Sequence, residues 1–229
     1  MLILALDAST AVTTVALARA DGDRRRVLAE ISAPSTKPSG GASEALLPAV
    51  HAALGLAGEE LSSVDRVLCG VGPGTFTGIR IAAATARALA LALGTGSALA
   101  RNSTLDALAA PALACRPDAL AVVDARRGEV FARRFSAGGP TTGIICSKPA
   151  DLSVMGSPLL VGDGAVRYRD ELERLGRIPP DDSPLNRVSA VGHVMSADLS
   201  PVAAGELVPA YVREPDAEVR RDLNPWGRP

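Results

Sequence analysis

The chain has 229 residues, of which 47% are hydrophobic and 21% charged, a balance typical of a compact globular protein rather than a disordered one. Its formal net charge is −1, so no global electrostatic attraction to nucleic acid or to an acidic membrane is expected. Aromatic residues make up only 3%, which leaves little for stacking unpaired bases. The length suits one large domain or two of about 100 residues, and we expect two.

The sequence predicts no export or membrane segment. The first residues are apolar only as far as Leu6, with no basic stretch before them. The longest apolar run, 81–93, is too short to cross a bilayer and contains Thr85 and Arg87. Three cysteines lie far apart without a CxxC spacing, which favours reduced thiols over a disulfide framework. We therefore expect a cytoplasmic protein.

The chain opens with a predicted hairpin, a loop and a helix. An apolar run, 2–6, and a β-branched run, 13–18, flank a turn of sequence DAST. Residues 32–41 are rich in proline, serine and glycine and predict a mobile loop. Ser43 can then cap a helix that carries an apolar stripe.

A glycine-rich loop follows, between a buried strand and a second helix. The strand is predicted at 64–71, the loop at 72–78 and the helix at 79–93. Free N–H groups at a helix N-terminus can bind an anion, but the loop has neither a Walker lysine nor the GxGxxG spacing. The loop is therefore either a tight turn, with Thr75 or Thr77 capping the helix, or an anion cradle.

The second helix has almost no polar side, because its only polar residues are Arg80, Thr85 and Arg87. A helix that is apolar all round must be covered all round. It is either enclosed between two lobes or part of a contact with another chain, and its alanines allow another helix to approach closely. We favour the contact with another chain.

The second half repeats the pattern of the first. Residues 119–135 predict another hairpin, which turns at Asp124-Ala125 as the first hairpin turns at Asp7-Ala8. The repeat fits either an internal duplication or chance. Further elements are predicted at 159–161, 165–175 and 187–198.

The composition divides the chain into two lobes and a tail. It changes near 95–105, which we interpret as the hinge, so the lobes are predicted at 1–100 and 101–213. Residues 214–229 are charged and interrupted by proline, which predicts a mobile tail.

Candidate catalytic groups are scarce. The only histidines, His51 and His193, lie in separate helical patterns, and no spacing typical of a metal site or a catalytic nucleophile occurs. Asp7 and Asp124 lie at hairpin turns, where aspartate more often binds backbone N–H groups than catalyses. Clustered arginines are typical of solvated faces, although each could contact a phosphate backbone. We expect no catalytic residue and no metal site in this chain.

Several segments together resemble the TsaB (YeaZ) family. They are LILALDAST, TTVALA, SEALLPAV, VDRVLCGVGPGTFTGIRIAAATARALA, VVDARRGEVFARRF and PAYVREPDA; they cover roughly residues 2–216, and GPGTFTGIR is the most specific. The resemblance implies an α/β fold of the ASKHA (actin-like, Hsp70-like) type, with two RNase-H-like lobes. It also implies a non-catalytic scaffold and activator of the paralogue TsaD, which transfers threonylcarbamoyl to the anticodon-adjacent adenosine of tRNA.

The same resemblance implies the partners. The chain would form a heterodimer with TsaD and a homodimer when alone, work with a third, TsaE-type ATPase, and meet tRNA only through the complex. ATP and metal would belong to the partner subunits, so this chain alone would bind no cofactor. The alternative is a stand-alone small-molecule kinase of the same fold.

The resemblance places the pairing surface on the two helices that flank the glycine loop. The interface candidates are Leu46, Leu47, Val50, Leu54, Ile81, Ala84, Ala88 and Leu91. The candidates that shape the edge of this surface or occupy the place of a phosphate hairpin are Asp7, Ser9, Thr10, Gly72, Gly74, Thr75, Thr77, Gly78 and Arg80. ATP-using relatives usually have glycine where Ser9 stands, so an autonomous ATP site is not expected. Many TsaB relatives have histidine where this chain has Ala42, so any role of that histidine is lost here.

Overall fold

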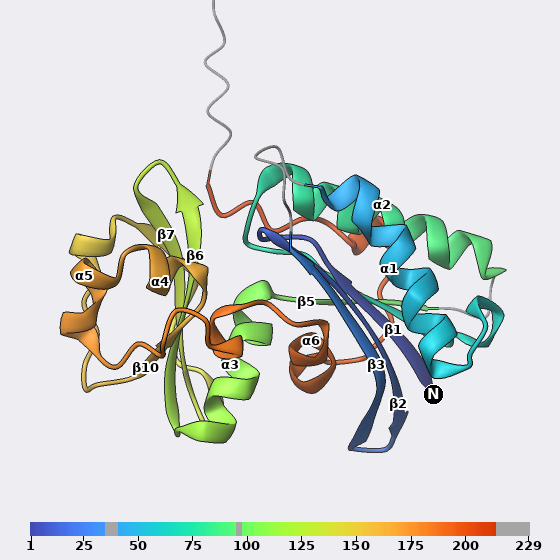
Figure 1. Ribbon diagram of the computed structural model, residues 1–229, viewed down its shortest axis with the longest axis horizontal. Coiled ribbons are helices and arrows are strands. Elements are labelled where there is room, and N and C mark those ends of the chain that lie inside the picture. The colour runs from blue at the N-terminus through green and yellow to red at the C-terminus, as the bar shows by residue number, and fades with distance from the viewer. Residues whose placement is uncertain (35–40, 95–97, 214–229) are drawn as a thin grey trace, which may run out of the picture.

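The computed structural model describes residues 1–34, 41–94 and 98–213. Figure 1 shows two lobes, each built on a five-stranded sheet. The predicted two-lobed α/β architecture is confirmed. The predicted tail, 214–229, lies outside the described residues.

The first sheet consists of β1 (Leu2–Asp7), β2 (Val12–Asp21), β3 (Arg24–Pro34), β4 (Arg66–Gly70) and β5 (Ala98–Asn102). Its strand order is β3-β2-β1-β4-β5. The predicted hairpin is β1–β2, β3 continues it antiparallel, and β4 and β5 run parallel to β1 and β4 respectively. The strand predicted at 64–71 is confirmed as β4.

β3 is missing from the sequence prediction. It is the edge strand, and most of its side chains are exposed or only half-buried, among them the consecutive residues Arg24, Arg25 and Arg26. Such a strand lacks the strong apolar alternation by which a half-buried strand is recognised. Residues 32–34 were assigned to a loop and are the end of β3, and 35–40 lie outside the described residues.

Two helices cover one face of the first sheet: α1 (Ala42–Ala57) and α2 (Phe76–Ala92). Leu4 and Leu6 of β1 pack on this side, whereas Ile3 and Ala5 between them point to the opposite face. This is the period-two alternation of a strand buried on both faces.

The helix caps differ from those predicted. The N-cap position of α1 is Gly41 and no side chain caps the helix, so the cap assigned to Ser43 is wrong. Ser43 is instead in the first turn. Thr75 does occupy the N-cap position of α2, but its side chain makes no cap hydrogen bond. The helix itself begins at Phe76, three residues before the predicted start at 79.

The second lobe begins with α3 (Thr104–Cys115). Its sheet has the order β10-β6-β7-β8, with β9 also paired to β7. The predicted hairpin at 119–135 is confirmed as β6–β7. The strands are β6 (Asp118–Arg126), β7 (Glu129–Ser136), β8 (Gly139–Pro140), β9 (Ile145–Ser147) and β10 (Leu159–Val161), and the helices that follow are α4 (Asp163–Arg167), α5 (Arg169–Leu172) and α6 (Ala190–Ser196).

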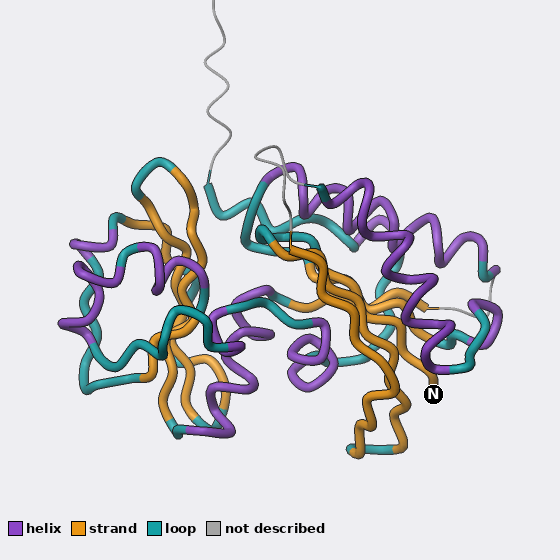
Figure 2. Tube along the Cα trace, viewed as in Figure 1, coloured by secondary structure: helices purple, strands orange, loops and turns teal. Residues whose placement is uncertain are grey.

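The two lobes interleave more than the predicted ranges 1–100 and 101–213 imply. β5 extends across the expected boundary and pairs with β4, so residues 98–102 are a strand and not a hinge. α6 returns from the second half and buries Ala190 and Val194 against the face of the first sheet that carries Ile3 and Ala5. Figure 2 shows α3 and α6 between the two sheets.

α6 is held by β3, the edge strand of the first sheet. Arg25 of β3 donates to the carbonyl oxygens of Val194 and Ala197 at the C-terminal end of α6. At the N-terminal end, the Ser189 hydroxyl donates to Glu30 at 2.6 Å. Charged side chains at both ends of the helix thus fix α6 on the first lobe. Both charges agree with the helix dipole, which favours the cation Arg25 at the C-terminal end and the anion Glu30 at the N-terminal end.

After α6 the chain runs back along the first lobe as residues 202–212, here called the C-terminal strap. The N–H of Val202 donates to Leu99 of β5 at 2.8 Å, and the N–H of Ala210 donates to Val71 at 2.7 Å. Arg87 of α2 donates to the carbonyl oxygens of Ala204 and Leu207 at 2.9 and 2.8 Å. The strap is therefore fastened to β5 and to one side of α2.

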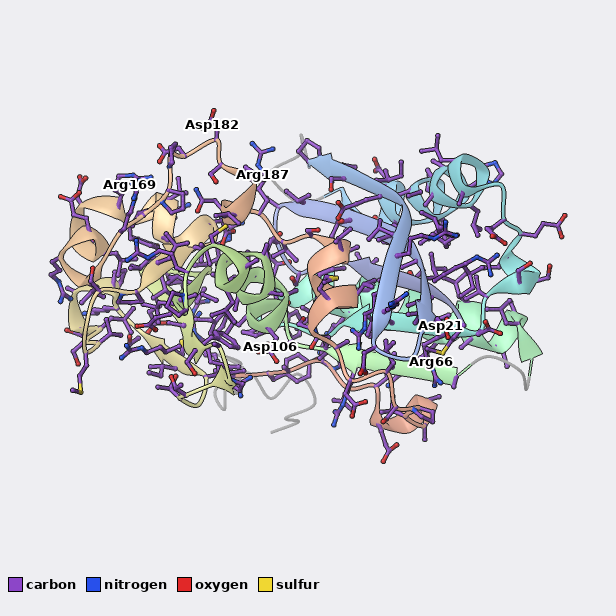
Figure 3. All side chains as sticks on the ribbon, turned by 90° about the horizontal axis from the view of Figure 1, so that it is seen from below. Asp21, Arg66, Asp106, Arg169, Asp182 and Arg187 are labelled. Carbon is purple, nitrogen blue, oxygen red and sulfur yellow. The ribbon has the colours of Figure 1, made fainter. Side chains whose placement is uncertain are left out.

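Charged side chains are distributed over both lobes. Figure 3 places Asp21 and Arg66 on the first lobe, Arg169 and Asp182 on the second, and Asp106 of α3 between them. Within residues 1–34, 41–94 and 98–213, no helix combines the length and hydropathy that a membrane span requires.

Candidate functional site

Asp7, at the end of β1, is completely buried. Its Oδ1 accepts hydrogen bonds from the N–H and the hydroxyl of Ser9, each at 2.7 Å, and its Oδ2 accepts one from Nε2 of His193 at 2.9 Å. The hydroxyl of Thr104, the first residue of α3, lies 2.9 Å from the Ser9 hydroxyl and 3.4 Å from Oδ2. One carboxylate thus joins the first hairpin to α3 and α6.

His193 is oriented by a second partner. The side-chain nitrogen of Asn102 lies 3.3 Å from Nδ1 of His193 and donates to the Ser196 hydroxyl at 2.7 Å. Since the amide nitrogen can only donate, Nδ1 is the acceptor, and the ring proton is on Nε2, where it is donated to Asp7. Burial works to raise the pKa of Asp7, but the interaction with His193 and the hydrogen bonds from Ser9 outweigh it and hold the pKa below its ordinary value.

The sequence identified one half of this arrangement. Asp7 was predicted to bind backbone N–H groups of its turn, and the bond from Ser9 confirms that. His193 was assigned to a helix without a partner, because its contact with Asp7 joins residues 186 positions apart. The one available signal was a histidine inside an apolar helical pattern, where an unpaired ring would be costly. His51, in contrast, is exposed on α1.

The glycine loop packs directly on the first hairpin. A Cβ at Gly70 would overlap the carboxylate of Asp7, one at Gly74 would overlap the carbonyl oxygen of Ser9, and one at Gly78 would overlap the carbonyl oxygen of Ala8. The N–H of Thr75 donates to Ser9 O at 2.6 Å. The glycines are needed for close backbone approach, which favours the tight turn over the anion cradle.

The nine hairpin and loop candidates separate into two groups. Those that meet at the junction of hairpin and loop are Asp7, Ser9, Gly74, Thr75 and Gly78. Gly72 instead adjoins Ile79 and the strap at Ala210. Thr10 accepts from the N–H of Val12 at 3.3 Å within its own turn, Thr77 is exposed, and Arg80 lies on the surface of α2. The structure brings five of the nine together where the hairpin packs on the loop.

The second hairpin repeats the first in several respects. The N–H of Arg126 donates to Asp124 at 2.9 Å, as that of Ser9 donates to Asp7. Glycines again approach the strand end, because a Cβ at Gly162 or Gly164 would overlap the backbone of residues 122–124. The recurrence supports the internal duplication that the sequence left open. The partners differ, however, since Asp124 is near the guanidinium groups of Arg126 and Arg167, at 3.3 and 3.5 Å.

Asp163, the first residue of α4, is a half-buried carboxyl that adjoins this hairpin. Its Oδ1 accepts from the N–H of Asp124 at 3.1 Å. Burial, with a contribution from the Asp124 charge, raises the pKa of Asp163 to about 6. Asp163 therefore titrates in the folded protein at a pH where most carboxyls are already ionised.

A pocket of about 550 Å³ opens where α3 begins, between the end of α6 and the strap. Its polar lining includes Asn102, Ser103, Asp106 and Ser196. Asp106 accepts from Arg133 at 2.9 Å, and burial raises the pKa of Asp106 despite this partner. In the part of the chain that the structure describes, no group of three or more histidine, cysteine or acidic residues could hold a metal ion.

The outer side of α1 and α2 is apolar and open to solvent. Leu47 and Leu56 of α1 are 56% and 71% exposed, and Leu91 of α2 is 83% exposed, with Ala84 and Ala88 exposed beside it. We call this surface the α1–α2 face. α2 is covered by the sheet, by α1 and by the strap, so it is neither enclosed between the lobes nor covered all round.

The eight interface candidates do not all belong to this face. Leu46, Val50 and Leu54 point toward the sheet and are buried in the core of the first lobe, because they form the inward stripe of α1. Ile81 is half-buried. The remaining four, Leu47, Ala84, Ala88 and Leu91, are exposed on the α1–α2 face.

An aromatic and cationic cluster borders the α1–α2 face where α2 begins. The guanidinium carbon of Arg80 lies 3.6 Å from the ring centroid of Phe76 and 5.6 Å from that of Tyr211 in the strap. Nε of Arg80 donates to the Tyr211 hydroxyl at 2.8 Å. Neither ring belongs to a residue predicted from the sequence to be functional. The available signal was an aromatic residue four positions before an arginine, a helical spacing, in a chain with few aromatics.

With this geometry established, comparison with known proteins identifies the family. Residues 28–195 match the family model described as "TsaD: tRNA N6-adenosine threonylcarbamoyltransferase". The chain is 33% identical over 216 residues to the uncharacterized protein Rv3421c of Mycobacterium tuberculosis, covering 94% of this chain and 93% of that protein. It is similar to the structure of YeaZ from Pseudomonas aeruginosa, with a TM-score of 0.75, 25% identity and coverage of 92% and 99%.

The chain belongs to the TsaD family, as a member of the TsaB (YeaZ) type. A second Pseudomonas aeruginosa structure, described as similar to peptidase YEAZ, agrees in fold, with a TM-score of 0.74 and 24% identity. The resemblance stated from the sequence is confirmed, and so is the ASKHA-like fold with two lobes. The family membership supports a role in tRNA modification.

The close approach of Gly78 to the first hairpin predicts a strong effect of a single methyl group. Gly78→Ala should lower the free energy of unfolding by roughly 1–3 kcal/mol, because the Cβ would meet the carbonyl oxygen of Ala8. Gly55→Ala is the matched control: it is also in a helix but faces open space, and should raise stability by about 0.5–1 kcal/mol. Urea unfolding measures both, and equal effects of the two substitutions would contradict the packing described.

The pair of Asp7 and His193 predicts a pH-dependent loss of stability. His193→Leu should cost about 3–5 kcal/mol at pH 7, because the carboxylate of Asp7 stays buried without its donor. The exposed His51, replaced by leucine, should change stability by less than about 0.5 kcal/mol.

The pH dependence follows from the lowered pKa of Asp7. In the wild type its stabilisation is present above the ordinary value of 3.8 and is lost as the pH falls through the folded value. In His193→Leu, burial acts on Asp7 without its main opposing partner and raises the pKa of Asp7. Its carboxylate is then protonated as the pH falls, so the difference in stability between the variant and the wild type should shrink at lower pH. Unfolding at pH 4–8 measures this, and a deficit independent of pH would contradict it.

Asp163 predicts the opposite trend. Its pKa is about 6 in the folded chain and 3.8 in the unfolded one, so the folded state binds the proton more tightly and stability from this group falls as the pH rises from 4 to 6. Asp163→Asn can still accept from the N–H of Asp124. As the pH rises from 4 to 6, the free energy of unfolding of this variant should therefore increase relative to that of the wild type, by about 3 kcal/mol at most. A stability difference that stays constant from pH 4 to 7 would show that Asp163 titrates normally.

Proposed function

We propose that this chain is a non-catalytic scaffold and activator subunit, which pairs through the α1–α2 face with a TsaD-type paralogue. That partner would transfer threonylcarbamoyl to the anticodon-adjacent adenosine of tRNA. The observation that carries the proposal is the exposed apolar α1–α2 face on a chain of this family.

The composition of the face suits a helix pairing. Leu47, Leu56 and Leu91 provide large apolar side chains, and the alanines between them let a second pair of helices approach closely. Large exposed apolar patches on a soluble chain mark interaction sites. A homodimer through the same face, when the partner is absent, is part of the proposal.

The state of the first hairpin argues against the kinase alternative. A phosphate-binding hairpin must present free donors to its ligand, whereas the hydroxyl of Ser9 is bonded to Asp7 and the N–H of Thr75 to Ser9. The carboxylate of Asp7 is buried and shared between His193 and Ser9. In the proposal, ATP and metal therefore belong to the partner subunits, including a TsaE-type ATPase, and tRNA is met through the complex in the cytoplasm.

Size-exclusion chromatography with light scattering, with and without the TsaD-type protein of the same organism, tests the proposal. A heterodimer should replace the homodimer, and threonylcarbamoylation of tRNA should appear only with the mixed peak. A chain that ignores the TsaD-type protein and turns over ATP by itself would establish the kinase instead.

Within the proposal, one substitution tests the face itself. Leu91→Glu places a charge on the α1–α2 face and should weaken pairing by about 100-fold, because burying an unpaired charge is costly. Met155→Glu is the matched control, since Met155 is also 83% exposed but lies on the second lobe. Dissociation constants for the TsaD-type protein measure both variants, and equal values would place the contact elsewhere.

A further inference from the structure

We propose that Arg80, stacked on Phe76 and hydrogen-bonded to Tyr211, is the residue that makes the α1–α2 face prefer a different chain over a second copy of itself. The occupant it selects is a TsaD-type partner that presents a carboxylate flanked by apolar side chains. This inference rests on the proposed function and names the specificity-determining residue of the same surface.

The first observation is that Arg80 is prepared for a partner before one binds. Its guanidinium carbon is stacked 3.6 Å from the centroid of Phe76, and the Tyr211 hydroxyl fixes Nε at 2.8 Å. The centroids of the two rings lie 5.7 Å apart, so Phe76 and Tyr211 also pack against each other beside the guanidinium group. An arginine ordered in this way loses little side-chain entropy on binding. Both rings are also exposed, and exposed aromatic and arginine side chains are typical of interface hot spots.

The second observation is that this cation keeps unused donors. Among the described residues, the only hydrogen-bond acceptor of Arg80 is the Tyr211 hydroxyl, which uses Nε. The two terminal nitrogens remain for a planar acceptor, and a carboxylate matches their fork. Arg87, the other arginine of α2, differs because the carbonyl oxygens of Ala204 and Leu207 in the strap already accept from it.

The third observation concerns what a second copy could offer. α1 and α2 together contain one carboxylate, Glu44, and it already has a contact within its own chain. Pairing of two copies through α1 and α2 therefore offers Arg80 no unengaged carboxylate from these helices. A partner that supplies one satisfies the charge, so the same apolar face binds that partner more tightly than it binds itself.

The strap places Tyr211 beside α2. The N–H of Ala210 is bonded to Val71, which sets the adjacent Tyr211 against Arg80. The strap thus contributes one of the two rings that orient the cation. Tyr211 fixes the orientation of the guanidinium group, and Arg80 carries its charge. A substitution at one of the two residues therefore changes the orientation or the charge separately.

The experiment measures two affinities for each variant: that for the purified TsaD-type protein of the same organism, and that of the homodimer by sedimentation equilibrium. Arg80→Glu should weaken binding of the TsaD-type protein by about 30-fold or more, because a carboxylate would then face a carboxylate. The homodimer should change by less than about threefold, because the reversal exchanges one unpaired charge for another. Arg24→Glu, an identical charge reversal on β3, should leave both affinities unchanged.

Tyr211→Phe keeps the charge and the ring but removes the hydrogen bond to Nε. It should weaken binding of the TsaD-type protein by about threefold to tenfold and leave the homodimer affinity unchanged. This loss is smaller than that expected for Arg80→Glu but equally selective. This variant keeps the inference testable if Arg80→Glu disturbs folding, which thermal unfolding of each variant reports.

Three results would overturn the inference. Equal weakening of homodimer and heterodimer by Arg80→Glu would make Arg80 a general contact, and no weakening of either would remove it from the interface. If Arg80→Glu weakened the binding of an unmodified tRNA transcript to the chain alone and left both protein affinities unchanged, the cluster of Arg80, Phe76 and Tyr211 would be a nucleic-acid-binding site instead. If the wild-type chain does not bind the TsaD-type protein, the proposed function fails first, which separates that failure from the failure of Arg80.

Discussion

The buried carboxylate of Asp7 is the constraint on which the first lobe and its neighbours depend. An ionised carboxylate removed from water must be satisfied by donors, and here they come from the turn at Ser9 and from His193, with Thr104 adjoining. These groups belong to β1–β2, α6 and α3. The return of α6 to the first lobe is therefore coupled to the charge state of one side chain, and the glycine at position 70 gives that side chain its space.

The rest of the arrangement follows from the return of α6. Once α6 lies on the first sheet, the strap runs along β5 and one side of α2, and Arg87 fastens it there. The sheet and α1 cover two other sides of α2. Only the outer side remains, which is why a helix that is apolar almost all round exposes Ala84, Ala88 and Leu91. In the same network, the N–H and the hydroxyl of Ser9 both donate to Asp7, so these donors of the first hairpin are used within the chain.

The parts of this structure that the sequence predicted are local. Both hairpins, β4 and most helices were recognised because their apolar periodicity and turn residues lie within about 20 positions. β3 was missed because an edge strand buries few side chains, and the capping of α1 because Gly41 takes the place that a serine usually fills. The pairing of Asp7 with His193, the strap and the ring pair around Arg80 join residues more than 100 positions apart. Nothing in a periodic pattern reports such contacts. The interface candidates show the same limit: the family resemblance assigned both Leu46 and Leu47 to the pairing surface, and only the packing on the sheet separates the exposed Leu47 from the buried Leu46.

An apolar helix face provides affinity without selecting its occupant, because leucine and alanine pack on any complementary apolar surface. A chain that pairs with a related protein meets this problem directly, since a copy of itself has a similar shape. Burying more apolar area would strengthen both pairings alike. A single ordered cation at the border of the face acts differently: it costs little where a carboxylate meets it and leaves an unsatisfied charge where none does. The rigidity supplied by Phe76 and by Tyr211 of the strap matters here, because a mobile arginine could turn away from an unsuitable partner and avoid the penalty. Selectivity at this surface thus depends on the strap, and through the strap on the same return of the chain that Asp7 secures.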